Sequence, residues 1–222
     1  MVRALILDFD GVVVESEAAK DALFREMFAR YPAHAAAAAG FHEANRALPR
    51  QRKFEHFVFE LLGLRDDEVL VRALVAEFGA LAVERVAACS LVAGARELLE
   101  RCAARHLPVY LASVTPRDDL LEVLGRQGLH GYFAEVFGDP PTTKAEAIEQ
   151  VLRATGAPRD DLVLVGDTAS DLRVASMAGI RFIGRQIPGT PELGQPSVPD
   201  LFGVLDSLDD PADRRGVLRY RE

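Results

Sequence analysis

Residues 2–12 read VRALILDFDGV, an apolar run that ends in two carboxylates, Asp8 and Asp10, and a glycine. The apolar run predicts a buried strand, and α/β enzymes hold their ligands at the carboxyl ends of such strands. On an extended backbone Asp8 and Asp10 point to the same face, and Gly11 lets the chain turn away at once. Two acids held together repel each other unless a cation or a shared proton lies between them. The alternative at this point is that acidic residues simply end a strand and enter a turn.

Later segments also place polar side chains at strand ends or helix starts. These are Asp167 and Asp171 after a strand predicted at 162–165, Ser113 after a strand predicted at 108–112, and Lys144 in the first turn of a helix predicted at 144–155. Each alone has a structural explanation, because hydroxyls cap helices and aspartate closes turns. Taken in order, the segments favour one shared site over several unrelated caps and turns.

With these four motifs the sequence closely resembles the haloacid dehalogenase (HAD) superfamily of aspartate-nucleophile phosphohydrolases, in its phosphoglycolate-phosphatase-like branch. The motifs are Asp8–Val12, Ser113, Lys144 and Gly166–Asp171. The resemblance covers residues 1–17 and about 93–185, whereas the stretch between them matches mainly in length and helical character. It implies a Rossmann-like parallel sheet flanked by helices, with a small α-helical cap inserted after the first motif.

The sequence pattern also predicts two units. After about residue 90 strands alternate with helices, which predicts a parallel sheet wrapped by helices. Before that point apolar residues recur at helical spacing, which predicts a small helical bundle. The three apolar stripes are Leu23, Met27 and Tyr31, then Phe54, Phe57, Val58, Leu61 and Leu62, then Val69, Leu70, Ala73, Leu74, Phe78 and Leu81. We expect an α/β core at residues 1–15 and 89–222 and a cap at residues 16–88. The proline-rich segment beyond residue 185 is expected to cover a sheet edge.

The carboxylates predict a metal site. Asp8 and Asp167, with a backbone carbonyl near Asp10 and several waters, would form an all-oxygen set, which suits a small hard cation such as Mg²⁺. Asp171 is expected to support this site, either around the metal or by holding Lys144. The predicted metal-site residues are therefore Asp8, Asp10, Asp167 and Asp171.

The same residues predict phosphoryl transfer. Asp8 is expected to attack phosphorus, and Asp10 to protonate the departing oxygen and later to take a proton from water. By family resemblance, dehalogenating members lack the second aspartate, so Asp10 favours a phosphatase. The groups expected to contact the phosphoryl oxygens are Ser113, Lys144 and the backbone amides around Gly11 and Val114.

Lysine is rare in this chain. It occurs only at Lys20, Lys53 and Lys144, while arginine supplies the other basic residues. Lys144 fits a requirement for a compact ammonium group. Lys53 lies in a basic run with Arg50 and Arg52, and we expect this cluster to contact an anionic substrate. The alternative is that Lys53 is a solvated residue on a helix face.

Composition excludes several classes of function. The net charge of −8 argues against nucleic acid as a partner, since binding to phosphate backbones needs a basic face. The two cysteines provide neither a disulfide framework nor a metal-ligand pattern. No signal pattern and no apolar stretch of membrane-spanning length is found, so no membrane partner is expected and the cytoplasm is the expected location. The oligomeric state is left open.

The function predicted from the sequence is a Mg²⁺-dependent phosphatase acting on a small phosphate ester. One alternative is a phosphoglucomutase-type isomerase, which uses the same aspartyl phosphate but returns the phosphoryl group to the sugar. Another is a binding protein on a retired enzyme fold.

Overall fold

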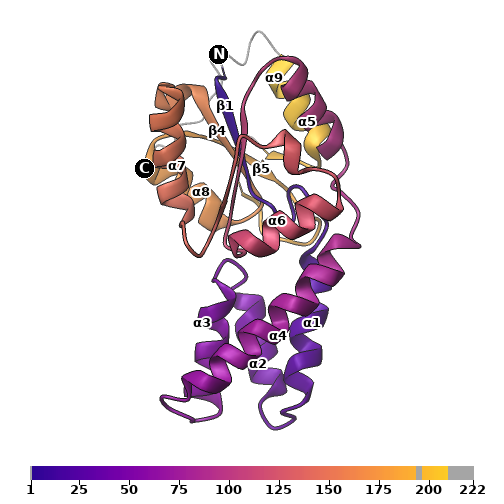
Figure 1. Cartoon of the computed structure of the whole chain (residues 1–222), viewed down its shortest axis with the longest axis vertical. Helices are drawn as coiled ribbons and strands as arrows, with labels where there is room; N and C mark the ends of the chain where they lie inside the picture. The colour runs from indigo at the N-terminus through magenta and orange to yellow at the C-terminus, as the bar shows by residue number, and fades with distance from the viewer. Residues whose placement is uncertain (1, 194–196, 210–222) are drawn as a thin grey trace.

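A parallel β-sheet forms the centre of the protein (Figure 1). The computed structural model describes residues 2–193 and 197–209. Its strands are β1 (Ala4–Leu7), β2 (Val109–Ser113), β3 (Glu135–Gly138), β4 (Leu162–Gly166), β5 (Arg181–Arg185) and β6 (Ser197–Val198). They lie in the order β3-β2-β1-β4-β5-β6, and every pair is parallel. This confirms the predicted Rossmann-like α/β fold. The chain reverses its direction of travel across the sheet at β1, the place where such folds bind ligands.

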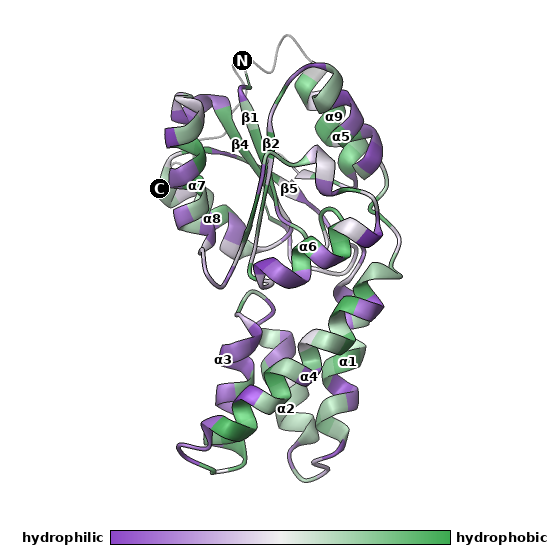
Figure 2. Cartoon of the chain, in the orientation of Figure 1, coloured by the Kyte–Doolittle hydropathy of each residue, from purple (hydrophilic) through white to green (hydrophobic). Residues whose placement is uncertain are grey.

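Helices cover both faces of the sheet (Figure 1). Helices α5 (Ala95–Ala104), α6 (Arg117–Arg126) and α9 (Leu201–Asp209) pack on one face, and α7 (Lys144–Thr155) and α8 (Ala169–Ala178) on the other. In β1, Leu5 and Leu7 face the first layer while Ala4 and Ile6 face the second. Because both faces are covered, the central strands β1 (ALIL) and β4 (LVLVG) contain no polar side chain, and they are green in Figure 2. Short 3₁₀ turns lie at His130–Tyr132 and Arg159–Asp161.

A separate helical bundle lies below the carboxyl ends of the strands (Figure 1). It contains α1 (Glu17–Ala29), α2 (Ala35–Ala44), α3 (Arg50–Glu55), the π-helical turn η1 (His56–Leu61) and α4 (Glu68–Ala87). The bundle has its own apolar cluster, built around Phe24, Phe28, Phe54, Phe57 and Phe78. The exact division of the chain into a core and a cap at residues 16 and 88 stays a prediction.

The predicted apolar stripe on α4 was partly wrong. Val69 is 70% exposed and Ala73 is also exposed, whereas Val71, Leu74 and Phe78 are buried. Helix α4 begins only at Glu68, so Val69 belongs to its first turn and faces solvent. The buried face then recurs at helical spacing from residue 71 onward.

Two chain segments join the bundle to the sheet, and they run side by side. The backbone N–H of Glu15 donates to the carbonyl of Ser90 (3.0 Å), and the N–H of Val92 donates to the carbonyl of Val13 (3.0 Å). The upper part of α4 packs Val83 and Val86 into the apolar layer under the sheet, so α4 belongs to both clusters. These contacts hold the bundle next to the carboxyl ends of the strands, where Asp8 lies.

The segment after β5 extends the sheet. Strand β6 pairs with β5 at the sheet edge, and α9 follows it against α5. This confirms the expectation that the segment covers a sheet edge. Residues 194–196 and 210–222 lie outside the described residues. Among the helices that are described, none is both long and apolar enough to cross a membrane.

Candidate active site

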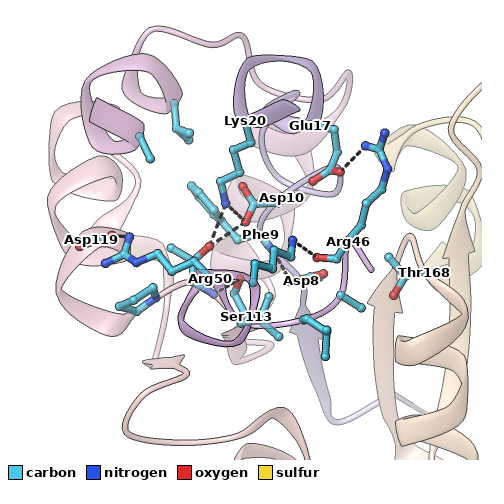
Figure 3. Close-up of a pocket in the computed structure, with 18 of the residues that line it drawn as sticks. Asp8, Phe9, Asp10, Glu17, Lys20, Arg46, Arg50, Ser113, Asp119 and Thr168 are labelled. Atoms are coloured by element: carbon cyan, nitrogen blue, oxygen red, sulfur yellow. Dashed lines mark hydrogen bonds and ion pairs between the residues drawn. The ribbon is translucent and has the colours of Figure 1, made fainter. Parts of the chain in front are cut away.

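The predicted site residues from the sheet side meet at one end of the sheet, facing the bundle. Asp8 follows β1, Ser113 ends β2, Asp167 follows β4, and Lys144 and Asp171 lie in the first turns of α7 and α8. They line a cavity of about 120 Å³ whose opposite wall comes from α1, α3 and α4 (Figure 3). Parallel strands bring their carboxyl ends to one edge, which explains how residues far apart in sequence converge here.

Lys144 links two of the carboxylates. Its Nζ donates a hydrogen bond to Asp171 Oδ1 and lies 3.1 Å from Asp8 Oδ2. The other oxygen of Asp8, Oδ1, accepts the backbone N–H of Phe9 at 2.7 Å. Burial opposes the charge on Lys144, but Asp171 and Asp8 outweigh burial and raise the pKa of the ammonium. Lys144 is therefore a fixed positive charge beside Asp8.

Asp171 is fixed by the start of its own helix. Helix α8 begins at Ala169, two residues earlier than predicted, and Thr168 is its N-cap. Asp171 Oδ2 accepts the Thr168 backbone N–H (3.1 Å), and the Asp171 N–H donates to Thr168 Oγ1 (3.3 Å), which is a capping box; the Thr168 hydroxyl also donates to Asp171 Oδ2 (2.6 Å). A Cβ on Gly166 would lie 2.4 Å from the Cβ of Asp171, so only glycine fits there. Since both its oxygens are engaged, Asp171 is placed to hold Lys144.

Three carboxylates form a group that could hold a metal ion. One oxygen from each of Asp8, Asp167 and Asp171 lies within 4.8 Å of the others, and all three residues are buried. Within the described part of the chain, no hydrogen bond or ion pair reaches the Asp167 carboxylate. Burial raises the pKa of Asp167 to about 9, and the charges of Asp8 and Asp171 add to this effect. Burial likewise raises the pKa of Asp8 to about 7, although Lys144 lowers it. Buried, mutually repelling oxygens of this kind fit a hard divalent cation.

The Asp10 carboxylate lies apart from this group. It accepts hydrogen bonds from Lys20 Nζ, from the Ser16 hydroxyl (2.6 Å) and from the Thr115 hydroxyl (2.9 Å), as Figure 3 shows for Lys20. Burial alone would raise its pKa, but Lys20 and the two hydroxyls lower it. The prediction of Asp10 as a metal ligand therefore finds no support for its side chain, and only its backbone carbonyl is left for that role.

The backbone amide of Gly11, which the sequence predicts to contact the phosphate, has a partner within its own loop. The backbone N–H of Gly11 donates to the carbonyl of Val14 (2.8 Å), so it is already engaged. Gly11 has φ +69°, and a Cβ there would lie 2.4 Å from Asp167 Oδ2. Its role is thus to let the loop turn close beside Asp167. Val114 lines the cavity next to Ser113, and the contact of its amide with a phosphoryl group stays a prediction.

Lys53 is not a solvated helix residue. It is 5% exposed, it lines the cavity, and its Nζ donates to the backbone carbonyl of Arg46 (2.9 Å). His42 Nδ1 lies 3.2 Å from the same amine, and His42 Nε2 lies 2.8 Å from Asp21 Oδ1. Burial lowers the pKa of Lys53 to about 8, and the charge of Lys20 adds to the effect. Burial also lowers the pKa of His42 to about 4, so a neutral His42 accepts from Lys53 and donates to Asp21.

The two arginines of the predicted basic cluster differ. Arg50 lines the cavity and forms an ion pair with Asp119 of α6, so it joins the bundle to the core (Figure 3). Its guanidinium lies against Gly79, where a Cβ would come within 2.8 Å of it. Arg52 instead points to solvent and pairs with Glu55 on the same helix.

The sequence reasoning missed Lys20 and Arg46, both of which line the cavity from the bundle. Lys20 reaches Asp10, and Arg46 pairs with Glu17 and Asp21. A signal for Lys20 was present, because all three lysines of this arginine-rich chain line the cavity. Arg46 had no such signal among many arginines.

Comparisons with known proteins agree with this geometry. The family model described as haloacid dehalogenase-like hydrolase matches residues 2–179. A search of curated proteins gave no match. Among solved structures, the HAD-hydrolase YfnB from Bacillus subtilis, bound to magnesium, has a TM-score of 0.72 and 16% identity, with 94% of this chain and 99% of that chain covered. A protein from Thermotoga maritima assigned as a β-phosphoglucomutase has a TM-score of 0.68 and 21% identity (93% and 98% covered). A protein from Haemophilus somnus assigned as a phosphoglycolate phosphatase has a TM-score of 0.69 and 16% identity, with 94% of this chain and 98% of that chain covered. At these identities the likeness concerns the fold.

Proposed function

Because the chain belongs to the haloacid dehalogenase-like hydrolase family, we propose that it is a Mg²⁺-dependent phosphatase that hydrolyses a small phosphorylated metabolite through an aspartyl phosphate. The observation that carries this proposal is the separation of two neighbouring carboxylates into different surroundings. Asp8 lies with Lys144 at the edge of the three-carboxylate group, while Asp10 lies with Lys20 and Thr115. Paired carboxylates in unlike environments are typical of a division of roles in catalysis.

In the first step a carboxylate oxygen of Asp8 forms a bond to phosphorus, and the bond from phosphorus to the ester oxygen breaks. Asp10 transfers a proton to that departing oxygen, which leaves as an alcohol. In the second step water attacks the phosphorus of the aspartyl phosphate and gives a proton to Asp10. The bond to Asp8 then breaks, which releases inorganic phosphate and restores the Asp8 carboxylate and the protonated Asp10.

The contacts of Asp10 support this double role. Lys20, Ser16 and Thr115 hold its carboxylate in one orientation, and they favour its ionised form. The ionised form is the one that accepts a proton from water in the second step. The proton that Asp10 takes from water in the second step is the one that it gives to the departing oxygen in the next turnover.

Residues at the carboxyl ends of the strands stabilise the negative charge on the phosphoryl group. The Lys144 ammonium and the Ser113 hydroxyl line the cavity beside Asp8 and are placed to stabilise the phosphoryl oxygens. A Mg²⁺ ion held by Asp8 and Asp167, with the Asp10 carbonyl, would neutralise part of the charge of the phosphoryl group and of the carboxylates. The bundle closes the opposite side of the cavity and excludes water from it.

Release of inorganic phosphate tests the proposal. The protein is incubated with Mg²⁺ and a panel of sugar, glycolate, nucleotide and polyol phosphates, and free phosphate is measured over time. We expect stoichiometric phosphate and alcohol from at least one small ester. An isomerised sugar phosphate without free phosphate would favour the phosphoglucomutase-type reaction, and turnover of no ester at all would favour a binding protein.

The bundle side of the cavity is proposed to select the leaving group, with Lys53 and Arg50 as contacts. Lys53→Met keeps the apolar stem of the side chain but removes the ammonium group. We expect kcat/KM for the preferred ester to fall by about tenfold to a hundredfold, the usual cost of losing a hydrogen bond to a charged group. Turnover of p-nitrophenyl phosphate, whose leaving group offers little to this wall, should change much less.

Arg52→Met is the matched control for this prediction. Arg52 lies one residue before Lys53 on α3, but it points to solvent and does not line the cavity. It should leave both rates unchanged. The same loss for both substrates in Lys53→Met, with an unchanged melting temperature, would remove Lys53 from substrate selection.

A further inference from the structure

Arg185, the last residue of β5, connects three segments of the chain through a buried guanidinium group. Its Nη1 donates to the backbone carbonyl of Gly11 (3.1 Å) and to Glu15 Oε2 (3.1 Å), and its Nη2 donates to Glu15 Oε1 (2.6 Å). Its Nε donates to the carbonyl of Pro199 (3.2 Å). All three nitrogens are used, and the side chain is 7% exposed. Nothing in the proposed reaction requires an arginine at this place.

The two inner partners of Arg185 lie on either side of Asp10 along the chain. Gly11 follows Asp10 directly, so the bond to its carbonyl fixes the Gly11–Val12 peptide, one residue beyond the proposed acid. Glu15 precedes Ser16, whose hydroxyl donates to the Asp10 carboxylate. A bidentate pair between arginine and a carboxylate fixes both distance and orientation. Arg185 therefore restrains Asp10 from its backbone side and from its side-chain side at once.

The middle of the loop is held by the core, where Val12, Val13 and Val14 are buried and the Val13 carbonyl accepts the Val92 N–H (3.0 Å). Within it, the amides of Val12, Val13 and Val14 all donate to the carbonyl of Phe9, which makes a compact turn. Such a turn can move as a unit unless a neighbouring element holds it. Arg185 adds a hold at the two ends of the loop, Gly11 and Glu15, from a strand that is itself paired with β4 and β6.

We propose that Arg185 is a positioning residue, which holds the loop after Asp8 and the Glu15 linker so that Asp10 is aligned with the departing oxygen of the substrate. This inference rests on the proposed function for the role of Asp10. It also gives a role to the C-terminal segment, because Pro199 accepts the third contact of the same guanidinium.

The test compares two esters of nearly equal size, phenyl phosphate and p-nitrophenyl phosphate. Phenol is the poorer leaving group and needs the proton from Asp10 more. In Arg185→Met we expect kcat/KM for phenyl phosphate to fall by about tenfold to a hundredfold, the cost of a misplaced catalytic group, and that for p-nitrophenyl phosphate to fall much less. Arg185→Lys keeps the positive charge but lacks the two parallel N–H donors of the guanidinium. This variant should recover part of the lost kcat/KM.

Arg159→Met is the control. Arg159 also pairs with both oxygens of a glutamate, Glu149, and donates to a backbone carbonyl, that of Ala178, but it lies away from the cavity. The Arg159→Met variant should be less stable, but the ratio of kcat/KM for phenyl phosphate to kcat/KM for p-nitrophenyl phosphate should not change. If Arg185→Met does not fold, Glu15→Gln, at a side chain that is 40% exposed, weakens the same pair from its other end. An unchanged ratio in the folded variant would overturn the inference.

Hydrogen exchange separates this inference from the proposed function. Amides of residues 9–16 should exchange faster in Arg185→Met or Glu15→Gln than in the parent protein and in Arg159→Met. If the parent protein releases phosphate from neither aryl ester nor any ester of the metabolite panel but this exchange still rises, the proposed function fails while the restraint by Arg185 stands. Unchanged exchange would show that Arg185 does not hold the loop, whatever the activity.

Discussion

Asp8→Asn is expected to abolish phosphate release, with a loss of at least about 10⁴-fold in kcat, the scale seen when a nucleophile is removed. An amide has the shape of the carboxylate and keeps an oxygen for the Phe9 N–H, but it does not form a stable bond to phosphorus. The loss should therefore come without loss of folding, measured by circular dichroism. Substantial phosphatase activity in Asp8→Asn would refute the mechanism.

Asp10→Asn provides the internal comparison. It should lower steady-state turnover by about 10²- to 10⁴-fold, the usual contribution of a general acid and base. With p-nitrophenyl phosphate, whose leaving group needs no proton, the first step should still occur and the second should be slow. We expect a burst of p-nitrophenolate stoichiometric with enzyme, followed by a slow rate. A slow rate without any burst would place Asp10 in the first step alone.

Metal removal is the second prediction of large effect. Chelation should eliminate activity, and added Mg²⁺ should restore it, because the buried carboxylates and an incoming phosphate dianion would otherwise repel each other. Asp167→Ala should eliminate activity or raise the Mg²⁺ concentration needed for half-maximal rate many-fold. Asp167 is the sharpest choice, since no other described residue bonds to its carboxylate. Full activity in excess chelator would contradict the proposed site.

The stability of the chelated protein gives a second readout of the same site. Burial holds the pKa of Asp8 at about 7 and that of Asp167 at about 9, above the usual value of about 4 for aspartate. The folded state therefore binds these two protons more tightly than the unfolded state does, which stabilises the fold. This stabilisation is complete below about pH 4 and is lost as the pH rises through 7 and 9. The melting temperature of the chelated protein should fall between pH 6 and pH 9.5. Mg²⁺ or Asp167→Asn should flatten this slope, and an equal slope in Asp167→Asn would assign it to other groups.

The sequence predicted those features that rest on local patterns. The apolar run before Asp8 predicts β1, and the helix predicted at residues 144–155 has the same bounds in the structure. Convergence of strand ends at one sheet edge then brought Asp167 and Ser113 to the predicted place.

Features that depend on distant pairing were not predictable. Lys20 and Thr115 meet at Asp10 although 95 residues separate them, and Arg185 reaches Glu15 across 170 residues. Neither arginine nor lysine carries a local signal for the carboxylate it will find. The engagement of the Gly11 amide was missed because a tight turn was predicted without its internal hydrogen bonds.

The joining of the two linkers has a consequence for how this protein can change over time. Seen from the sheet, the chain leaves at Glu15 and returns at Ser90 within a single hydrogen bond of its point of departure. The entropic cost of closing such an insertion grows only with the logarithm of its length. The stability of the sheet therefore depends little on how many residues the insertion contains. Insertions, deletions and exchanges in Glu17–Ala87 that keep Lys20 beside Asp10 can therefore accumulate while the strand register and the carboxylates stay where they are. The residues of the sheet that carry the reaction and the residues of the bundle that select the substrate can thus evolve at different rates within one chain.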